Sequence, residues 1–363
     1  MFAFRPARAL ITVGAIGMGA LGGAPFAHAQ SSITLYGIAD TSLLYTSKTI
    51  DSSTGGDAGR QFSMSSGGIS SSVFGLKGSE DLGGGLRAKF NIESGYDIGT
   101  GAVGDSNGNV FGRQAWVGLD GGFGEFKAGL QYSPFFIASY LADARNMSQF
   151  GSGLINYLDS VLVTGLFNPN AVSYTSPVIA GVQGSAMMAL GGTAGSHRAG
   201  QQYSASLVYQ NGTLMVDAAL YSGNAGGSAA SIPVASTVAF DGRMLGASYQ
   251  FGALKAKLSY ALYKVAGSFD SRVFSGGLSC YVTPAFSLDA GVWVTRDGNN
   301  ANNHSLLASA GADYLLSKRT MVYAQAGFVN NHGAMDTGLA VNDALYGTTG
   351  TTVGVELGIR HTF

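Results

Sequence analysis

The last stretch of the chain shows the pattern that the rest of the sequence repeats, and it reads Thr352-Val353-Gly354-Val355-Glu356-Leu357-Gly358-Ile359-Arg360-His361-Thr362-Phe363. Its odd positions are apolar up to Ile359 and its even positions are polar or glycine, which is the period of two of a β-strand. The chain then ends on an aromatic residue. This pattern fits the last strand of a transmembrane barrel, whose apolar face contacts lipid while the terminal ring lies at the membrane interface. An amphipathic edge strand of a soluble protein fits it equally well, so the rest of the chain must decide.

The first residues have the layout of a secretory signal. Arg5 and Arg8 form a short positive start, an apolar run follows from Ala9 to about Gly23, and Ala27-His28-Ala29 is a small-x-small cleavage site. We predict a signal peptide over residues 1–29 and a single barrel domain over residues 30–363. An N-terminal membrane anchor is disfavoured because the apolar run is short and rich in glycine and alanine.

The composition combines much apolar surface with few charges. Charged residues make up 11% of the chain, against a usual share of ~25%, while 46% of residues are hydrophobic and 56 of 363 are glycine. Yet no later segment is long and apolar enough for a transmembrane helix. A β-barrel reconciles these facts, because its lipid-facing residues alternate with polar ones and never form a run. The formal net charge of −1 gives no basic surface for nucleic acid. The single cysteine, Cys280, excludes an internal disulfide.

The alternation recurs in about sixteen segments, an even number, each near the ~9–11 residues that cross a membrane at a tilt. In the clearest segment Phe90 and Ile92 face one side, while Arg87, Lys89 and Glu93 face the other. That second face must be wet, because unpaired charges are not buried. A barrel of ~16–18 strands keeps an aqueous lumen. The sequence therefore predicts an all-β fold, a transmembrane antiparallel β-barrel of about 16 strands.

The longest connection between predicted strands runs from Ser133 to about Pro169 and is rich in apolar residues. A loop of this length is usually functional or disordered. Because its apolar residues need a surface to pack on, we expect it to fold into the lumen. A short helix within Pro134–Arg145 fits its sequence.

Several motifs together resemble the general porins of Gram-negative bacteria, specifically the betaproteobacterial trimeric porins. They are Ser31-Ser32-Ile33-Thr34-Leu35-Tyr36-Gly37, the segment from Gly75 to Ala88, Gly112-Arg113-Gln114-Ala115-Trp116-Val117-Gly118-Leu119, Leu316-Ser317-Lys318-Arg319-Thr320, and the terminal Gly358-Ile359-Arg360-His361-Thr362-Phe363. The resemblance implies a homotrimer among outer-membrane lipids that passes small hydrophilic solutes and ions by passive diffusion. It also implies that the long third loop narrows the lumen, and that Phe363 serves the outer-membrane assembly machinery as a signal.

The resemblance also implies where the constriction lies. In the family, basic wall residues face acidic groups on the third loop, and Arg113 falls on one of the wall-arginine positions. Val73 and Phe167 stand where the family pattern has arginine, and the loop carries only two acidic residues, Asp143 and Asp159. We therefore expect weak charge selectivity. Strand parity predicts that six further charged residues face the lumen: Arg87, Lys89, Glu93, Lys127, Lys255 and Lys257. Each of them could equally be a wall residue that contacts water and has no role in selectivity.

Three other functions find less support in the sequence. His197, His304 and His332 lie in or beside loops with no spacing that pairs them with a nucleophile, so we expect no enzyme. Asp105-Ser106-Asn107-Gly108-Asn109 resembles the start of a calcium loop but lacks the required glycine position and closing glutamate, so we expect no metal and no cofactor. A substrate-specific channel with a binding site in the constriction remains an alternative, because the long loop carries aromatic residues.

Overall fold

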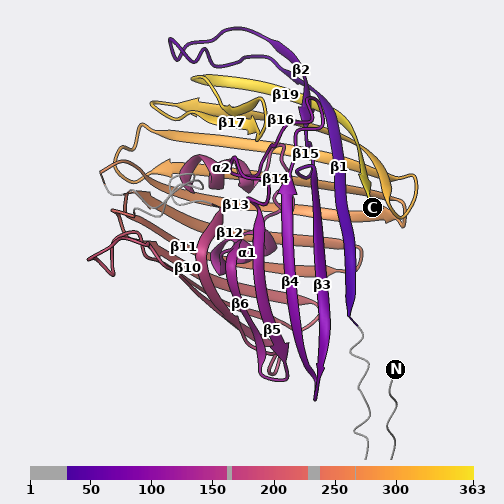
Figure 1. The fold of residues 1–363 in the computed structure, drawn as a ribbon. Coiled ribbons are helices and arrows are strands. Elements are labelled where there is room, and N and C mark those ends of the chain that lie inside the picture. The colour runs from indigo at the N-terminus through magenta and orange to yellow at the C-terminus, as the bar shows by residue number, and fades with distance from the viewer. Residues whose placement is uncertain (1–30, 162–165, 228–237, 266) are drawn as a thin grey trace, which may run out of the picture.

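The computed structural model describes residues 31–161, 166–227, 238–265 and 267–363, which form a β-barrel with two helices inside it (Figure 1). The predicted signal peptide, residues 1–29, lies outside the described residues. The helices are α1 (Pro134–Ala142) and α2 (Gly153–Val161). The strands are β1 (Ser32–Thr46), β2 (Gln61–Ser66), β3 (Val73–Gly83), β4 (Leu86–Gly95), β5 (Gln114–Gly121), β6 (Gly124–Tyr132), β7 (Phe167–Thr175), β8 (Val182–Ala189), β9 (Gln202–Gln210), β10 (Leu214–Gly223), β11 (Phe240–Phe251), β12 (Leu254–Val265), β13 (Asp270–Thr283), β14 (Phe286–Asp297), β15 (His304–Leu315), β16 (Thr320–His332), β17 (Thr337–Ala340), β18 (Ala344–Tyr346) and β19 (Gly350–Thr362).

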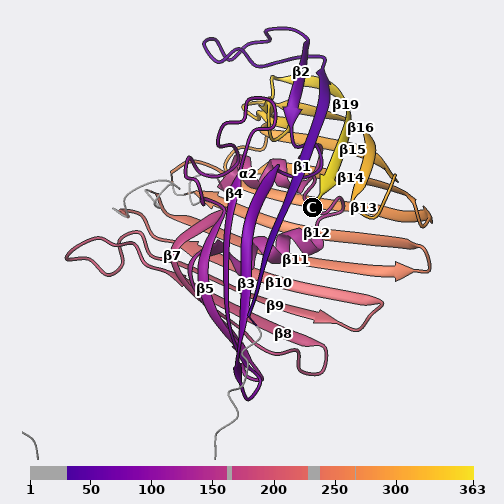
Figure 2. The same ribbon diagram turned by 45° about the vertical axis from the view of Figure 1, so that its right-hand side comes forward.

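Successive wall strands pair antiparallel around the barrel, and the pairing of β1 with β19 closes it. The first half of β1 pairs with β3 and its second half with β2, so β2 and β3 share one position in the wall. Strands β17 and β18 form a separate pair. The described strands therefore fill sixteen wall positions, and the predicted sixteen-stranded barrel is confirmed. Figure 2 shows β8–β13 side by side in this wall.

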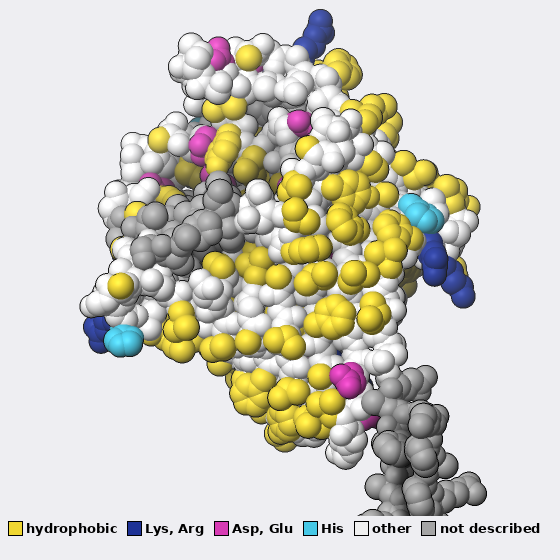
Figure 3. Space-filling view, in the orientation of Figure 1, with side chains coloured by type: hydrophobic (Ala, Val, Ile, Leu, Met, Phe, Trp, Pro, Cys, Tyr) yellow, Lys and Arg dark blue, Asp and Glu magenta, His cyan; other side chains and the backbone are white. Residues whose placement is uncertain are grey.

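The outer surface of the barrel is apolar, as the alternation predicts. In β19 the side chain of Leu357 is 56% exposed, whereas that of its neighbour Glu356 is 1% exposed and faces inward. Figure 3 shows hydrophobic side chains spread along the outward sides of the strands, with few charged ones between them. Within the described ranges no helix is long and apolar enough to cross a membrane.

The hydrophobic core lies inside the barrel, where the third loop packs against the wall. The hydroxyl of Ser133 accepts a hydrogen bond from the backbone N–H of Phe136 at 3.1 Å, which caps α1, and Pro134 occupies its first turn. The ring of Phe135 then lies against Tyr157 of α2 and against the wall residues Tyr221 and Tyr263. The prediction that this loop folds into the lumen is confirmed.

Three features differ from the sequence-based expectations. The polar sequence from Ser47 to Ser66 predicts a loop, but its last part forms β2. The alternation from about Ile69 to Gly78 predicts a strand, and β3 begins only at Val73. Between them the chain turns into the lumen, because the carboxylate of Asp40 accepts the backbone N–H groups of Gly68, Ile69 and Ser70 at 2.9–3.3 Å. Helix α2 and the pair β17–β18 also lie in segments for which the sequence predicts irregular structure.

Candidate functional site

A cavity of about 700 Å³ lies inside the barrel, between the third loop and the wall. Its lining combines apolar side chains of the third loop with charged and amide side chains that come from that loop, from the wall and from other inward segments. Six charged residues line it, three acidic and three basic: Asp105, Asp289, Asp313, Arg113, Arg145 and Arg360. The charges of the lining are therefore balanced.

Arg113, just before β5, is tied to its neighbours in four directions. Its Nε donates to Oε1 of Glu93 at 2.8 Å, and its two terminal nitrogens donate to the backbone oxygen of Asp105 and to the hydroxyl of Tyr132. Its guanidinium also lies 5.1 Å from the ring centre of Phe167. Glu93 in turn accepts a hydrogen bond from Tyr36 at 2.9 Å. Most of the positive charge of Arg113 is thus compensated within the wall.

Arg145, in the loop after α1, connects the third loop to three strands of the barrel wall. It forms an ion pair with Asp289 of β14 and donates to Gln325 of β16 and Ser309 of β15. It also donates to the carbonyl oxygens of Phe150 and Gly151 in its own loop. A fully hydrogen-bonded guanidinium of this kind fixes the position of the loop that bears it.

Asp143 organises the loop from within. Its Oδ1 accepts the N–H groups of Arg145 and Met147, and its Oδ2 accepts the N–H of Gly153 and the indole N–H of Trp293, all at 2.8–3.0 Å. Trp293 belongs to the wall strand β14, so this carboxylate joins the loop to the barrel. Asp143, which the sequence places at the constriction, is therefore a buried carboxylate that accepts all four of these hydrogen bonds, and its effect on selectivity stays a prediction.

Lys257 of β12 supports the same loop. Its ammonium group donates to the backbone oxygen of Asp143 at 2.8 Å and to the side chain of Asn146 at 2.7 Å, and the residue is 5% exposed. Lys257 does face the lumen, as strand parity predicts. It acts as a contact between wall and loop, and its charge is not open to the water of the lumen.

The loop before β19 completes the cavity, and the sequence does not predict it there. Val341, Asn342 and Leu345 line it. This inward segment hydrogen-bonds the third loop, since the N–H of Gly151 donates to the carbonyl of Leu339 at 2.7 Å and that of Val341 to the carbonyl of Gln149 at 2.8 Å. Two loops far apart in sequence therefore build one side of the cavity together.

The two positions that depart from the family's arginine pattern differ in their surroundings. Phe167 opens β7, lines the cavity and lies against Tyr132 and Arg113. Val73 opens β3, points inward and is only 4% exposed. The cavity lining at that level of the wall comes from Ile69, Ser70 and Ser71. Val73 therefore faces the barrel interior from a buried position, and its role at the constriction stays a prediction.

The other predicted lumen charges lie away from the cavity. Arg87, Lys89 and Lys127 lie near the short turns at the ends of β4 and β6, where they pair with Asp120 and Glu125. Lys255 lies beside the short turn before β12. Asp159 lies on α2 near Asp336, and burial together with that second carboxylate raises the pKa of Asp159 to about 7. None of these five residues lines the cavity.

Sequence reasoning missed Arg145, Asp289, Asp313 and Arg360 as lumen charges. Asp289, Asp313 and Arg360 have inward strand parity, which was the available signal, whereas nothing in the sequence near Arg145 indicates its distant partners. In the part of the chain that the structure describes, no group of three or more His, Cys, Asp or Glu residues could hold a metal ion.

Comparisons with known proteins agree with this architecture. The model of the Gram-negative porin family matches residues 13–334. Outer membrane porin protein 32 of Delftia acidovorans is 30% identical and covers 96% of this chain and 99% of its own length. An outer membrane porin protein of Bordetella pertussis is also 30% identical, over 93% of this chain and 96% of its own length.

Solved structures show the same fold. An anion-selective porin from Comamonas acidovorans superposes with a TM-score of 0.77 at 26% identity, covering 92% of this chain and all of its own. OmpT of Vibrio cholerae, in its trimer form, superposes with a TM-score of 0.65 at 16% identity, over 92% of this chain and 99% of its own. The second likeness concerns the fold alone.

Proposed function

The chain belongs to the Gram-negative porin family, and we propose that the cavity beside the third loop is the narrowest part of a weakly charge-selective channel. As an outer-membrane porin, the protein provides a water-filled path for the passive diffusion of small hydrophilic solutes and ions. A barrel of ~16–18 strands is wide enough for such a path. The third loop then determines how much of that width remains open.

The observation that carries the proposal is the balance of charge in the cavity lining, three carboxylates against three guanidinium groups. A solute in a constriction lies within a Debye length of the wall, ~8 Å in physiological salt, so the fixed charges there decide which ions enter. Arg113 and Arg145 are already paired with Glu93 and Asp289. Little net field is left to favour anions over cations.

Solute size separates this proposal from a substrate-specific channel. Proteoliposomes containing the purified protein are placed in isotonic sugars of increasing size, and the swelling rate is measured. For general diffusion we expect a smooth fall of the rate with sugar size and no saturation with concentration. A swelling rate that saturates with the concentration of one sugar, while sugars of similar size do not enter, would instead establish a specific binding site.

We also propose that the protein is a homotrimer, as OmpT of Vibrio cholerae is in its trimer form. In planar bilayers, a single insertion event should then close in three equal steps. Native mass spectrometry of the detergent-solubilised protein gives the stoichiometry independently. A single closing step together with a monomer mass would contradict the trimer without affecting the channel.

Export and assembly complete the proposal. Signal cleavage after Ala29 is checked by the intact mass of the protein from outer-membrane fractions. Phe363 exchanges two backbone hydrogen bonds with Gly37 of β1, both at 3.1 Å, and so closes the seam between the first and last strands. We expect deletion of Phe363 to lower the amount of heat-modifiable barrel, and Phe363→Tyr to restore it, because an aromatic ring at this position suits the membrane interface.

A further inference from the structure

Four basic side chains form a row across the outer surface of the barrel. Arg272 of β13 is directly opposite Arg296 of β14, Arg296 is opposite His304 of β15, and His304 is opposite His332 of β16. All four are exposed on the outward, lipid-facing side of their strands. They lie at the end of the barrel that carries the longer loops, which in barrels of this kind is the extracellular end.

This row has an excess of positive charge. Like charges directly opposite each other in a sheet are destabilising, so two facing arginines need a compensating anion. Arg272 pairs with Asp270 at 3.2 Å, whereas Arg296 has no ion pair with any residue in the described ranges. The carboxylate of Asp297 accepts hydrogen bonds from Asn299 and Asn303 in its own loop. Arg296 therefore has no ion-pair partner among the described residues, although the carboxylate of Asp297 lines the same hollow.

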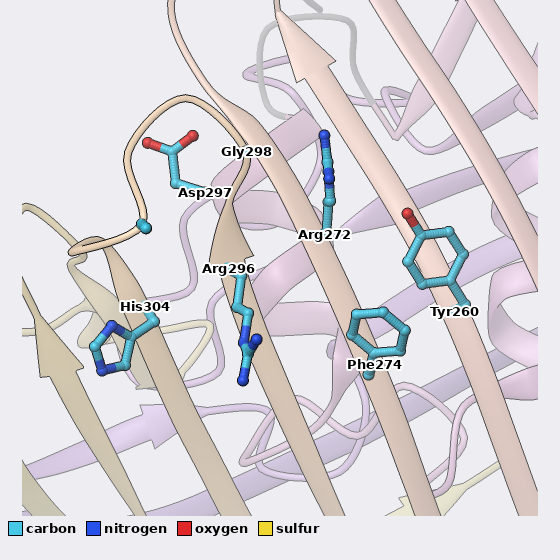
Figure 4. A pocket seen from close by; sticks show the side chains of 8 residues that line it. Tyr260, Arg272, Phe274, Arg296, Asp297, Gly298 and His304 are labelled. Atoms are coloured by element: carbon cyan, nitrogen blue, oxygen red, sulfur yellow. The ribbon is translucent and has the colours of Figure 1, made fainter.

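The row borders a hollow of about 770 Å³ on the barrel surface. Figure 4 shows Arg272, Arg296 and His304 on adjacent strands at one side of the sheet, with the rings of Tyr260 and Phe274 beside them. Guanidinium groups bind phosphate through two parallel hydrogen bonds, and imidazole adds a further donor. The chemistry of the hollow therefore matches a phosphate group.

An apolar groove continues from the basic row toward the middle of the membrane. The next outward positions on β13–β15 are Phe274, Val294 and Leu306, which follow Arg272, Arg296 and His304 in register. Beyond them lies a groove of about 640 Å³, with Phe328 of β16 and Thr351 of β19 at its far side, whose outward lining on β13–β15 is small or aliphatic: Gly276, Leu278, Ala290, Val292, Ala308 and Ala310. A charged row above an apolar groove on the same strands is complementary to a lipid, whose head group would lie at the row and whose acyl chain would lie in the groove.

We propose that the outer face of β13–β16 binds a phosphorylated lipid of the outer leaflet. Its phosphate lies between Arg272 and Arg296, with His304 and His332 beside it, and an acyl chain lies in the groove below. Two features of this face favour a lipid over a soluble anion, namely the excess charge of the row and its continuity with the groove. A soluble phosphate ion would share the head-group chemistry but would leave the groove unused.

The test measures binding of lipid A to the detergent-solubilised, folded protein by microscale thermophoresis, with EDTA present to remove bridging divalent cations. Dephosphorylated lipid A and inorganic phosphate are the two comparison ligands. We expect lipid A to bind at least roughly tenfold more tightly than either, because hydrogen bonds between charged groups are the strong ones. The double variant Arg272→Gln/Arg296→Gln should lose that preference.

Two matched controls test whether binding depends on this site, one by removing an arginine elsewhere on the outer face and one by adding a large side chain elsewhere. Arg243→Gln removes an outward arginine at the same end of the barrel, but its cross-strand neighbours are Leu220 and Leu262, so it should leave binding unchanged. Ala308→Phe fills the groove and should weaken binding of lipid A only. Ala247→Phe adds the same ring on the outward face of β11, away from the groove, and should not weaken binding of lipid A.

Heat-modifiability on gels confirms that each variant is folded before binding is measured. Equal binding of lipid A and its dephosphorylated form would overturn the proposal. So would equal binding of inorganic phosphate and lipid A with no effect of Ala308→Phe, since the site would then be one for a soluble anion.

Discussion

Nε of Arg113 lies 2.8 Å from Oε1 of Glu93, and both side chains are largely screened from the lumen. Arg113 therefore lines the cavity as one partner of an ion pair. Its contribution to anion attraction depends on the residue beside it. The behaviour of the channel follows from such pairings more than from the number of arginines in the sequence.

Removing the acid of this pair should expose the charge of its partner. We expect Glu93→Gln to shift the reversal potential toward anion selectivity, because the positive charge of Arg113 is no longer compensated. The matched control is Glu125→Gln, which also removes a carboxylate from the inner wall but lies near the short turns, beside Lys89 and Lys127. A larger shift in the control than in Glu93→Gln would place the constriction elsewhere.

Phe167 offers a second way to change the charge of the cavity. Phe167→Arg adds a cation beside Arg113, and Glu93 is the only acid in an ion pair with that arginine in the described chain. We expect a shift toward anions in bilayer recordings under a KCl gradient. Phe167→Leu removes the same ring without adding charge, so its selectivity should equal that of the wild type. An unchanged reversal potential for Phe167→Arg would show that this position does not face the ion path.

The contacts of Arg145 between the third loop and the wall should be required for a channel with low current noise. Arg145→Met leaves Asp289 unpaired and removes four further hydrogen-bond partners. Breaking one side of a buried ion pair costs roughly 3–5 kcal/mol. We expect increased current noise, a lower midpoint of thermal unfolding and a shift toward cations. Lys89→Met breaks more exposed pairs, worth about 0–1 kcal/mol, and should change none of the three.

The docking of α2 should depend on pH through Asp159. Its pKa is raised to about 7 by burial and by Asp336, from an ordinary value of ~3.9. The folded loop therefore retains a proton that the undocked loop releases, so docking is most stable at low pH and weakens as pH rises through 7. Hydrogen exchange of residues 153–161, corrected for intrinsic rates, should be slower at pH 5 than at pH 8.5.

Asp159→Asn should remove that difference, because the amide does not titrate. Helix α1 carries no acidic residue and serves as the internal control, with equal protection at both pH values. Protection of residues 153–161 that increases with pH would contradict the assignment.

The wall strands were predictable because lipid on one side and water on the other impose a period of two. This is why the parity of β19 and the inward position of Glu93 followed from the sequence. The segments that fold into the lumen carry no such period. The turn at Gly68 exists because the carboxylate of Asp40, 28 residues earlier, accepts its N–H, and no local pattern indicates that contact.

The same reason limited prediction of the site. Arg113 was identified through a motif and through strand parity. Arg145 was not, because Asp289 and Gln325, which give it its role, are 144 and 180 residues away in sequence. The sequence also did not indicate the inward turn before β3, whose residues Ile69, Ser70 and Ser71 line the cavity, because that turn depends on tertiary contacts with Asp40.

The reversal potential of the wild-type channel is the most direct measure of its charge selectivity. Single channels are recorded in a planar bilayer of neutral lipids under a tenfold KCl gradient, so that no surface charge biases the ions. The balanced lining of the cavity predicts an open, water-filled conductance with a reversal potential close to zero. A reversal potential near the chloride equilibrium value would show strong anion selectivity, and the proposed weakly selective constriction would then be wrong.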